Sequence, residues 1–384
     1  MSLKTDYLKI LKNNQRNSGG RFFTLPSSSY YPHQWFWDSC FHSIIYASFG
    51  QFQKAEDELK SLLAKQWENG MIPHMIYLND ARFDEDWGTN QMTSSITQPP
   101  MIAYAMEKIC KRNKKFVKDM FEQLEKYYDW LYDARSEDYL LSIVHPWESG
   151  LDDFVSWDSV LCLENPDKKT LADKKRYLLA EYVKTGHDSR RFMKRNLFNV
   201  KCLVFNSIYI LNLRSMVTLA KVLGKNSEQK YQNRLDKTII AYKRFFDKKT
   251  GVYTTFDSNG FVKNNNNFSV FFPLVAGVLT EEEAKGLVTK MKTHDFWTKY
   301  PIPTVAKTDK SFEADRYWRG TVWININWFL CKALRKYGFF EVADEIKKKS
   351  LELVKTGFYE YFNPITGEGH GPDDFSWSGL VFDM

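Results

Sequence analysis

Apolar side chains recur at helical spacing along much of the chain. Such spacing predicts an amphipathic helix over residues 51–67, followed by Gly70 as a stop signal. Its apolar positions are Phe52, Ala55, Leu59, Leu62 and Leu63. A helix before it is predicted to run to Phe49, with Gly50 beyond its end and Asp38 interpreted as its N-terminal cap.

This unit of two helices and a long loop recurs. Further pairs are predicted at 97–112 and 115–134, at 197–223 and 227–246, and at 322–337 and 339–355. One more helix is expected from Leu3 to Asn13, and short Val/Thr/Phe stretches such as 252–256 predict small hairpins. Helix pairs of the same polarity, each delivering a loop to one end, predict an all-α fold closed into an α/α toroid. An open solenoid is the alternative, but no consensus repeat or polar capping repeat is visible.

The charge pattern argues against several classes of partner. The net charge is +7, yet Lys and Glu alternate in stretches such as 54–60, a pattern typical of a solvated helix face. No basic stripe carries interleaved stacking aromatics, so a nucleic-acid partner is not expected. No apolar run approaches the length of a membrane span, so no membrane contact is expected either. No Pro- or Gly-rich linker divides the chain, which predicts a single domain over residues 1–384.

The cysteines and histidines indicate neither a disulfide framework nor a metal centre. Five cysteines lie at wide spacings without a CxxC motif, and seven histidines are scattered. The chain opens without an apolar signal-peptide region, so we expect a reducing cytoplasm. Phosphate-binding Gly-rich loops and the GxSxG motif of serine hydrolases are also missing, and we expect no metal and no cofactor.

Acidic residues are concentrated in one short stretch, His145–Asp153. It holds Glu148, Asp152 and Asp153 beside an aromatic ring. Like charges so close together disfavour ionisation, which suits a carboxyl that has to stay protonated. We interpret Asp152 as a general acid and Glu148 as a structural residue. Aromatic residues make up 16% of the chain, and flat rings suit the CH faces of sugars.

A second acid at the other end of the chain could complete the chemistry. Glu360 stands between two tyrosines and is either paired with Arg316 or Arg319 or poised for catalysis. Two carboxylates suffice to hydrolyse a glycoside: one protonates the leaving oxygen while the other activates water, at a separation of about 6.5–9.5 Å for inversion. Asp38 is expected mainly as a helix cap that could also hold sugar hydroxyls.

Several motifs in order along the chain carry a family resemblance. They are Gln34-Trp35-Phe36-Trp37-Asp38, Gly70-Met71-Ile72-Pro73-His74, Glu148-Ser149-Gly150-Leu151-Asp152-Asp153, Arg316-Tyr317-Trp318-Arg319-Gly320, Glu360-Tyr361-Phe362-Asn363-Pro364 and Phe375-Ser376-Trp377-Ser378. Together they resemble glycoside hydrolase family 63, most closely its bacterial mannosylglycerate/glucosylglycerate hydrolase branch. Trehalases share the Glu-Ser-Gly-x-Asp signature.

The resemblance implies an (α/α)6 barrel and an inverting, exo-acting α-glycosidase for an α-glucosyl or α-mannosyl small substrate, without metal. It implies Asp152 as general acid and Glu360 as general base. It places Tyr31, Trp37, Asp38, Gln98 and Trp147 around the non-reducing sugar. It places Tyr317, Trp318 and Trp323 on the side of the leaving group.

One departure from the family pattern concerns glycerate. The glycerate-cleaving branch carries an Arg and a Tyr for the carboxylate where Lys168 and Lys174 stand here, and lysine lacks the planar fork of arginine. The sequence therefore leaves a glycosylglycerate or a neutral α-disaccharide open as the substrate. Two other classes also stay open. One is an epimerase-like α/α-barrel isomerase using His33, His74 or His145, and the other is a non-catalytic sugar-binding protein.

Overall fold

The protein is described here from a computed structural model that covers residues 2–78, 86–263 and 266–384. Helices dominate it. They are α1 (Leu3–Asn14), α2 (Phe36–Ser48), α3 (Phe52–Leu63), α5 (Ile102–Cys110), α6 (Lys114–Arg135), α7 (Ser156–Val160), α8 (Lys168–Val183), α9 (Ser189–Lys194), α10 (Leu203–Leu223), α11 (Glu228–Tyr242), α12 (Phe272–Ala276), α13 (Glu281–Met291), α14 (Ile324–Lys336) and α15 (Phe340–Val354).

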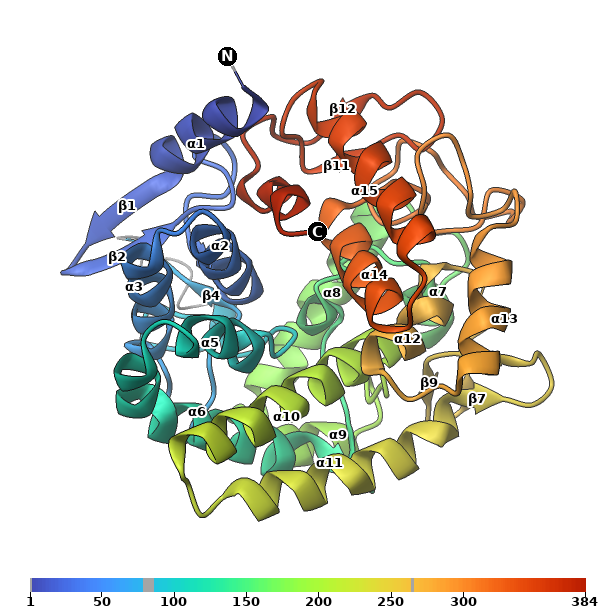
Figure 1. Ribbon diagram of the computed structural model, residues 1–384. Coiled ribbons are helices and arrows are strands. Elements are labelled where there is room, and N and C mark those ends of the chain that lie inside the picture. The colour runs from blue at the N-terminus through green and yellow to red at the C-terminus, as the bar shows by residue number, and fades with distance from the viewer. Residues whose placement is uncertain (1, 79–85, 264–265) are drawn as a thin grey trace.

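Six elements form a closed inner ring. In order around the ring, α2 contacts α5, α5 contacts α10, and then come α12, α14 and the 3-10 helix η4 (Ser376–Phe382), which returns to α2. The outer helices α1, α3, α6, α11 and α15 each pack against their inner partner, and the arrangement is visible in Figure 1. This closure confirms the (α/α)6 barrel and excludes the open solenoid.

The strands are short two-residue to four-residue ribbons, all antiparallel. They are β1 (Gln15–Ser18) with β2 (Arg21–Thr24), β3 (Gln34–Trp35) with β4 (Met75–Ile76), β5 (Ser136–Glu137) with β6 (Leu140–Leu141), β7 (Phe246–Asp247) with β8 (Val252–Tyr253), β9 (Phe256–Asp257) with β10 (Gly260–Phe261), and β11 (Tyr361–Phe362) with β12 (Gly369–His370). The hairpin expected at 252–256 is confirmed as parts of two such ribbons.

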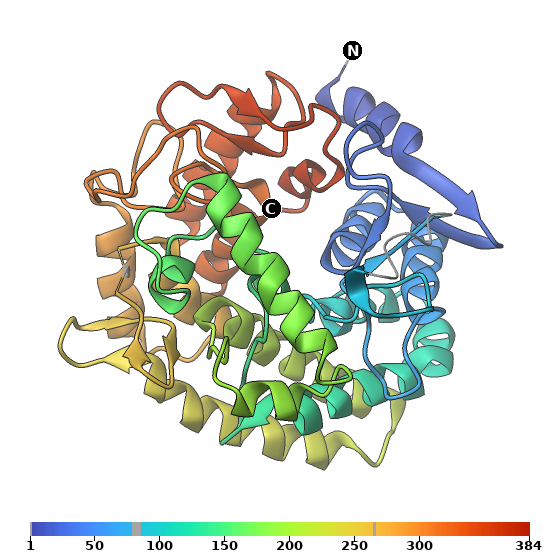
Figure 2. The same ribbon diagram turned by 180° about the vertical axis from the view of Figure 1, so that it is seen from behind.

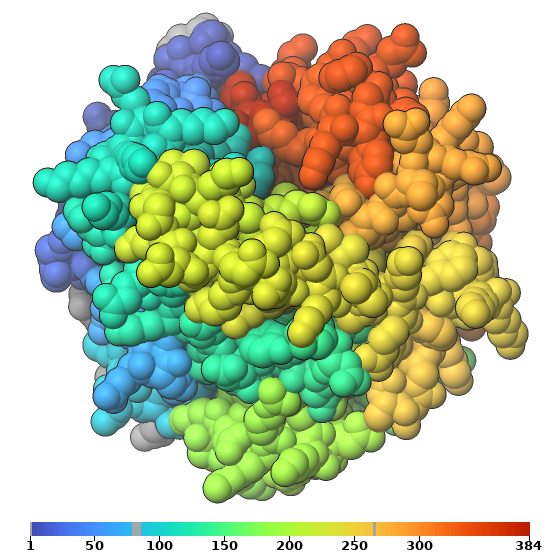
Figure 3. Space-filling view, turned by 60° about the horizontal axis from the view of Figure 1, so that its bottom comes forward, coloured from blue at the N-terminus to red at the C-terminus, as the bar shows by residue number. Residues whose placement is uncertain are grey.

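The outer helices meet through charged side chains. Lys230 and Arg234 of α11 both bind Asp129 of α6, with N–O distances of 2.9 and 3.0 Å. Figure 3 shows these outer segments covering one face of the molecule. The inner helix α10 is the one helix among the described residues that is long and apolar enough to cross a membrane by length and composition, but 78% of its apolar window is buried in the protein. Such burial is typical of a core helix.

Some predicted elements differ from the structure. The helix after Asp38 begins at Phe36, and its N-cap is Trp35 without a side-chain cap. Asp38 therefore lies inside the first turn, and its interpretation as the cap was wrong. The helix predicted at 51–67 ends at Leu63, before the Gly70 stop signal.

The segments that lead into the inner helices bring the candidate residues to one end of the barrel. Trp35 precedes α2, Gln98 precedes α5, and Trp323 is the N-cap of α14. In the opposite view, Figure 2 shows α8 lying across the middle of the ring. This helix therefore helps to wall the opening of the site.

Candidate active site

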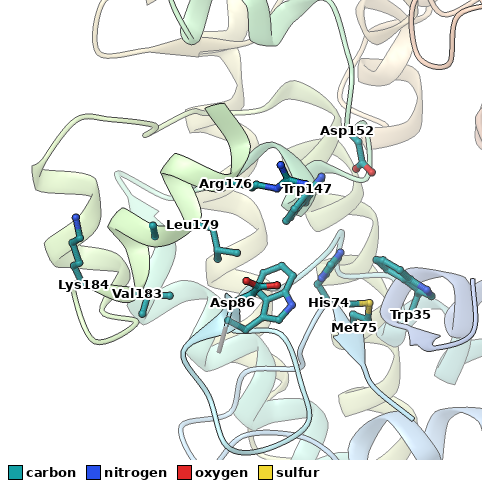
Figure 4. Close-up of a pocket in the computed structure, with 12 residues that line it drawn as sticks. Trp35, His74, Met75, Asp86, Trp147, Asp152, Arg176, Leu179, Val183 and Lys184 are labelled. Carbon is teal, nitrogen blue, oxygen red and sulfur yellow. The ribbon is translucent and has the colours of Figure 1, made fainter. Parts of the chain in front are cut away.

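Two neighbouring cavities lie at this end of the barrel. The smaller one is lined by aromatic rings and by the three acids Asp38, Asp152 and Glu360. The larger one, of about 690 Å³, lies between α8 and the segments around His74 and Trp147 (Figure 4). Among the described residues, only Trp35, His74 and Asp152 line both cavities. Asp152 therefore stands where the two spaces meet.

The turn that carries Asp152 is fixed from both sides. Pro146–Ser149 form a short 3-10 helix that ends at Gly150 with a φ of 70°. A Cβ at Gly150 would lie 2.5 Å from the ring of Trp37, so only glycine allows this approach. Burial raises the pKa of Asp152 to about 6, while Lys175 lowers it and Asp153 raises it. The shift has the direction that a general acid needs.

Glu148 is held as a structural residue. It accepts two hydrogen bonds from Arg135, at 2.6 and 2.7 Å, and two more from the backbone N–H groups of Thr97 and Val144. Both members of the ion pair are at most 1% exposed. A fully partnered buried carboxylate fixes the loop and has no free oxygen for chemistry.

Glu360 lies in the smaller cavity and is bonded by two tyrosines. The hydroxyl groups of Tyr31 and Tyr317 donate to its Oε1 at 3.0 and 3.1 Å, and no hydrogen bond to Oε2 occurs among the described residues. A Cβ at Gly371 would lie 2.6 Å from Oε2, so glycine keeps that side open. Burial raises the pKa of Glu360 to about 8, the two tyrosine hydrogen bonds lower it, and Asp152 raises it.

Neither of the two arginines considered as partners of Glu360 pairs with it. Arg319 makes a two-fold hydrogen bond to Asp158, at 2.6 and 2.8 Å, and approaches Asp153 at 3.9 Å. Arg316 pairs with Glu313 at 2.8 Å and lies 3.7 Å from Asp153. Of the two alternatives for Glu360, pairing with Arg316 or Arg319 is excluded, and its carboxyl group is held by two tyrosine hydroxyls instead.

The smaller cavity also holds Trp37, Asp38 and Gln98. The side chain of Gln98 accepts the backbone N–H of Trp37 at 3.1 Å, which ties the start of α2 to the segment before α5. Burial raises the pKa of Asp38 well above its ordinary value, and Glu360 and Asp152 raise it further. A neutral Asp38 can both donate to and accept from a sugar hydroxyl.

The segment 317–323 contributes two residues to the smaller cavity. Tyr317 and Trp318 line it. Tyr317 has a φ of 23°, a strained conformation of the kind found at functional sites. Trp323 is completely buried and stacks on Trp318 with ring centroids 3.7 Å apart. It lies behind Trp318 and packs at the start of α14.

Trp147 lines the larger cavity. Its ring is parallel to that of His74, 6.3 Å away, and Lys175 lies over it at 5.7 Å. Lys175 also donates to the backbone oxygen of Asp152 at 3.2 Å. This lysine thereby connects α8 to the loop of the acid.

Among the described residues, no group of three or more His, Cys, Asp or Glu side chains could hold a metal ion.

The histidines near the cavities make hydrogen bonds to other parts of the protein. His145 accepts the backbone N–H of Trp147 through Nδ1 at 3.2 Å, and its Nε2 lies 3.0 Å from the Lys175 oxygen. Burial lowers the pKa of both His74 and His145 to about 3, so both are neutral at physiological pH.

Comparison with known proteins decides the family. Residues 31–378 match the mannosylglycerate hydrolase MGH1-like glycoside hydrolase domain. The chain belongs to this glycoside hydrolase family. The resemblance to family 63 is thereby confirmed, and the protein is a glycoside hydrolase.

Relatives of this family cover nearly the whole chain. The mannosylglycerate hydrolase of Thermus thermophilus is 32% identical over 97% of this chain and 99% of its own. The glucosylglycerate hydrolase of Mycolicibacterium hassiacum is 28% identical over 91% of both chains. A crystal structure of the family 63 mannosylglycerate hydrolase from a second strain of T. thermophilus, in complex with Tris and D-glycerate, superposes with a TM-score of 0.90, 30% identity and 99% coverage of both chains.

More distant structures share the fold alone. Neutral trehalase Nth1 from Saccharomyces cerevisiae is 12% identical, with a TM-score of 0.62 over 98% of this chain and 78% of its own.

Some residues that line the two cavities were not predicted from the sequence as substrate contacts. Trp35, Phe375 and Trp377 line the smaller cavity, and each belongs to a motif of the resemblance. Arg176 lines the larger one from α8. No helix was predicted there, so nothing in the sequence indicated which of its charged residues would face inward.

Proposed function

We propose that the protein hydrolyses α-mannosyl or α-glucosyl glycerate with inversion, using Asp152 as general acid and Glu360 as general base. The observation that carries this proposal is the position of Asp152 at the junction of the two cavities. An acid there can protonate a glycosidic oxygen that links a sugar in the smaller cavity to a leaving group in the larger one. Glu360, in the smaller cavity, is placed to activate a water.

The remaining lining residues take their roles from this arrangement. Trp37, Asp38 and Gln98 bind the sugar, together with Tyr31, Tyr317 and Trp318. Trp147 contacts the leaving group, and Trp323 supports Trp318 from behind. A sugar surrounded by this set, next to the space for the leaving group, fits removal of a single non-reducing residue, which is exo action.

Helix α8 offers a cation, Arg176, to a carboxylate on the leaving group. Arg176 lines the larger cavity, and its ion pair with Asp173 is loose, at 3.6 Å, with the arginine side chain 77% exposed. Such a surface pair contributes little, so Arg176 is free to turn to a substrate carboxylate. Lys168 and Lys174, which align with the expected glycerate-binding positions, are exposed and line neither cavity.

The isomerase alternative loses its candidate bases. A histidine with a pKa near 3 is a weak base at neutral pH, because proton abstraction works best with a pKa near the working pH. His145 uses both ring nitrogens for hydrogen bonds, and His33 accepts the backbone N–H of Leu78 at 3.3 Å. The acids of the smaller cavity are better suited to glycoside hydrolysis.

The test is a panel of α-mannosylglycerate, α-glucosylglycerate and neutral α-disaccharides, followed by proton NMR. We expect turnover of the glycosylglycerates, with the β-anomer as the first-formed sugar. The α-anomer appearing first would contradict inversion. Equal rates on neutral disaccharides would contradict the role of Arg176, and binding of the glycosylglycerates without turnover would contradict the proposed substrate.

The paired acids also predict a bell-shaped dependence of kcat/KM on pH. Glycoside hydrolysis needs one proton on the pair, and both one-proton forms titrate together. Activity is therefore expected to fall below a pH of about 6, where both acids are protonated, and above about 8, where both are ionised. The pKa of Glu360 is about two units higher than that of Asp152. When the pair shares one proton, the proton is therefore on Asp152 in only roughly a hundredth of the molecules.

Lys175→Met tests the coupling of α8 to the acid. Without the positive charge, the pKa of Asp152 rises, so the acidic limb of the profile is expected to move to higher pH while the alkaline limb stays. Lys174→Met, on an exposed residue of the same helix, serves as the matched control. An acidic limb that does not move would show that Lys175 is only structural.

We also infer that the enzyme works in the cytoplasm as a single domain. Its five cysteines, Cys40, Cys110, Cys162, Cys202 and Cys331, are all free, which fits a reducing compartment. The buried apolar residues form one continuous cluster, which supports one folding unit. Fractionation of cells and limited proteolysis test these two points.

A further inference from the structure

One face of α8 forms a long wall of the larger cavity. Arg176, Leu179, Ala180 and Val183 line it, at the spacing that places residues on one side of a helix. At 1.5 Å per residue, the wall from Arg176 to Val183 is about 10 Å long. Figure 4 shows Arg176 beside Trp147, with Leu179 and Val183 progressively farther from Asp152.

The part of the cavity beyond Arg176 is mostly apolar, and the charged residues Asp86 and Lys184 also line the cavity. Met75, Trp87 and Trp147 line the opposite wall, and the rings of Trp87 and Trp147 are 5.6 Å apart. Trp87 is 4% and Leu179 6% exposed, which fixes both walls. A Cβ at Gly88 would lie 2.5 Å from Val183, so the segment after Trp87 closes tightly on the end of α8.

An ordinary core-facing side of a helix would fill this space. Here Ala180 is exposed and Val183 is only half-buried, although their faces point to the cavity. The volume of about 690 Å³ falls within the range of about 300–1,000 Å³ for pockets that enclose drug-sized ligands. The three carbons of glycerate would occupy only the part next to Asp152 and Arg176.

We propose that the preferred leaving group is a 2-hydroxy acid larger than glycerate. Its carboxylate lies at Arg176, and its alkyl or aryl side chain lies between Leu179, Val183 and Trp87. The proposal rests on the glycosidase function above and names the class of its substrate: 2-O-α-glycosides of hydroxy acids with an apolar side chain.

Calorimetric binding of the free acids tests this without turnover. D-glycerate and 3-phenyllactate carry the same carboxylate and 2-hydroxyl groups and differ in the side chain. We expect the wild-type protein to bind phenyllactate at least about 10-fold more tightly, because a ring leaves water for an apolar wall. Arg176→Met should weaken the binding of both acids to the same extent, since it removes the contact with the carboxylate that they share.

Val183→Asn is the discriminating variant. It should reduce the preference for phenyllactate to less than about 3-fold while leaving the affinity for glycerate unchanged. Lys174→Asn, on an exposed residue of α8 outside the cavity, is the matched control and should change neither affinity. Equal affinities for both acids in the wild-type protein would overturn the proposal, and so would an equal loss of both in Val183→Asn. A failure of hydrolysis itself would appear in the glycoside panel and not in this measurement.

Discussion

Asp152→Asn is expected to lower kcat on a glycosylglycerate by about 10³-fold to 10⁴-fold. The amide cannot give a proton to the glycosidic oxygen, and the alkoxide of glycerate is a poor leaving group without one. A glycoside of 4-nitrophenol needs little protonation, so the variant should lose much less activity on it. Comparing the two substrates separates a lost acid from a damaged site.

The fold should tolerate this substitution. The carboxyl group of Asp152 makes no side-chain hydrogen bond to any described residue, and its raised pKa means that its ionised form is disfavoured in the folded protein. The variant should therefore melt at the same temperature as the wild-type protein or slightly above it. Asp153→Asn, which loses the approach of Arg316 and Arg319, should mainly lower stability. Wild-type activity in a folded Asp152→Asn protein would remove Asp152 from the mechanism.

Glu360→Gln is expected to lower kcat by about 10²-fold to 10⁴-fold on every glycoside, whatever the leaving group. The glutamine can still accept hydrogen bonds from Tyr31 and Tyr317, but it cannot remove a proton from water. Loss on both the glycerate and the 4-nitrophenyl substrate would distinguish it from Asp152→Asn. Wild-type activity of Glu360→Gln on the 4-nitrophenyl glycoside would contradict the assignment of Glu360 as the base.

A control in the same loop excludes a general effect of charge. Glu368 is exposed, and Glu368→Gln should leave kcat and KM unchanged.

Tyr317→Phe should keep part of the activity but raise the pKa of Glu360, since the hydrogen bond from the Tyr317 hydroxyl lowers that pKa. The alkaline limb of the pH profile should then move upward. An unchanged limb would mean that the hydroxyl of Tyr317 does not act on Glu360.

The sequence predicted the barrel because most of its helix pairs carry clear apolar periodicity. It did not predict α8, whose sixteen residues are rich in lysine and bury only a few scattered side chains. It also did not predict α12, which has five residues and is too short to show a period. Both helices take their stability from the ring around them, which local spacing does not reveal.

The two proposed catalytic acids could be singled out from the sequence because rings and carboxylates adjoin within short motifs. Their neighbours were not accessible, because they come from distant segments. Arg319 and Asp158 are 161 positions apart, and Glu360 meets Tyr31 across 329 positions.

The closed ring also has a consequence for biosynthesis. Its last inner element, η4, contacts α2, and Tyr7 donates to the backbone oxygen of Ser376 at 2.6 Å, across 369 positions. Contacts between such distant segments cannot form while a chain is still being made, and they slow folding. Until η4 has left the ribosome, the N-terminal helices expose an apolar surface that only the end of the chain can cover. We therefore expect the nascent chain to depend on a chaperone that shields this surface during translation.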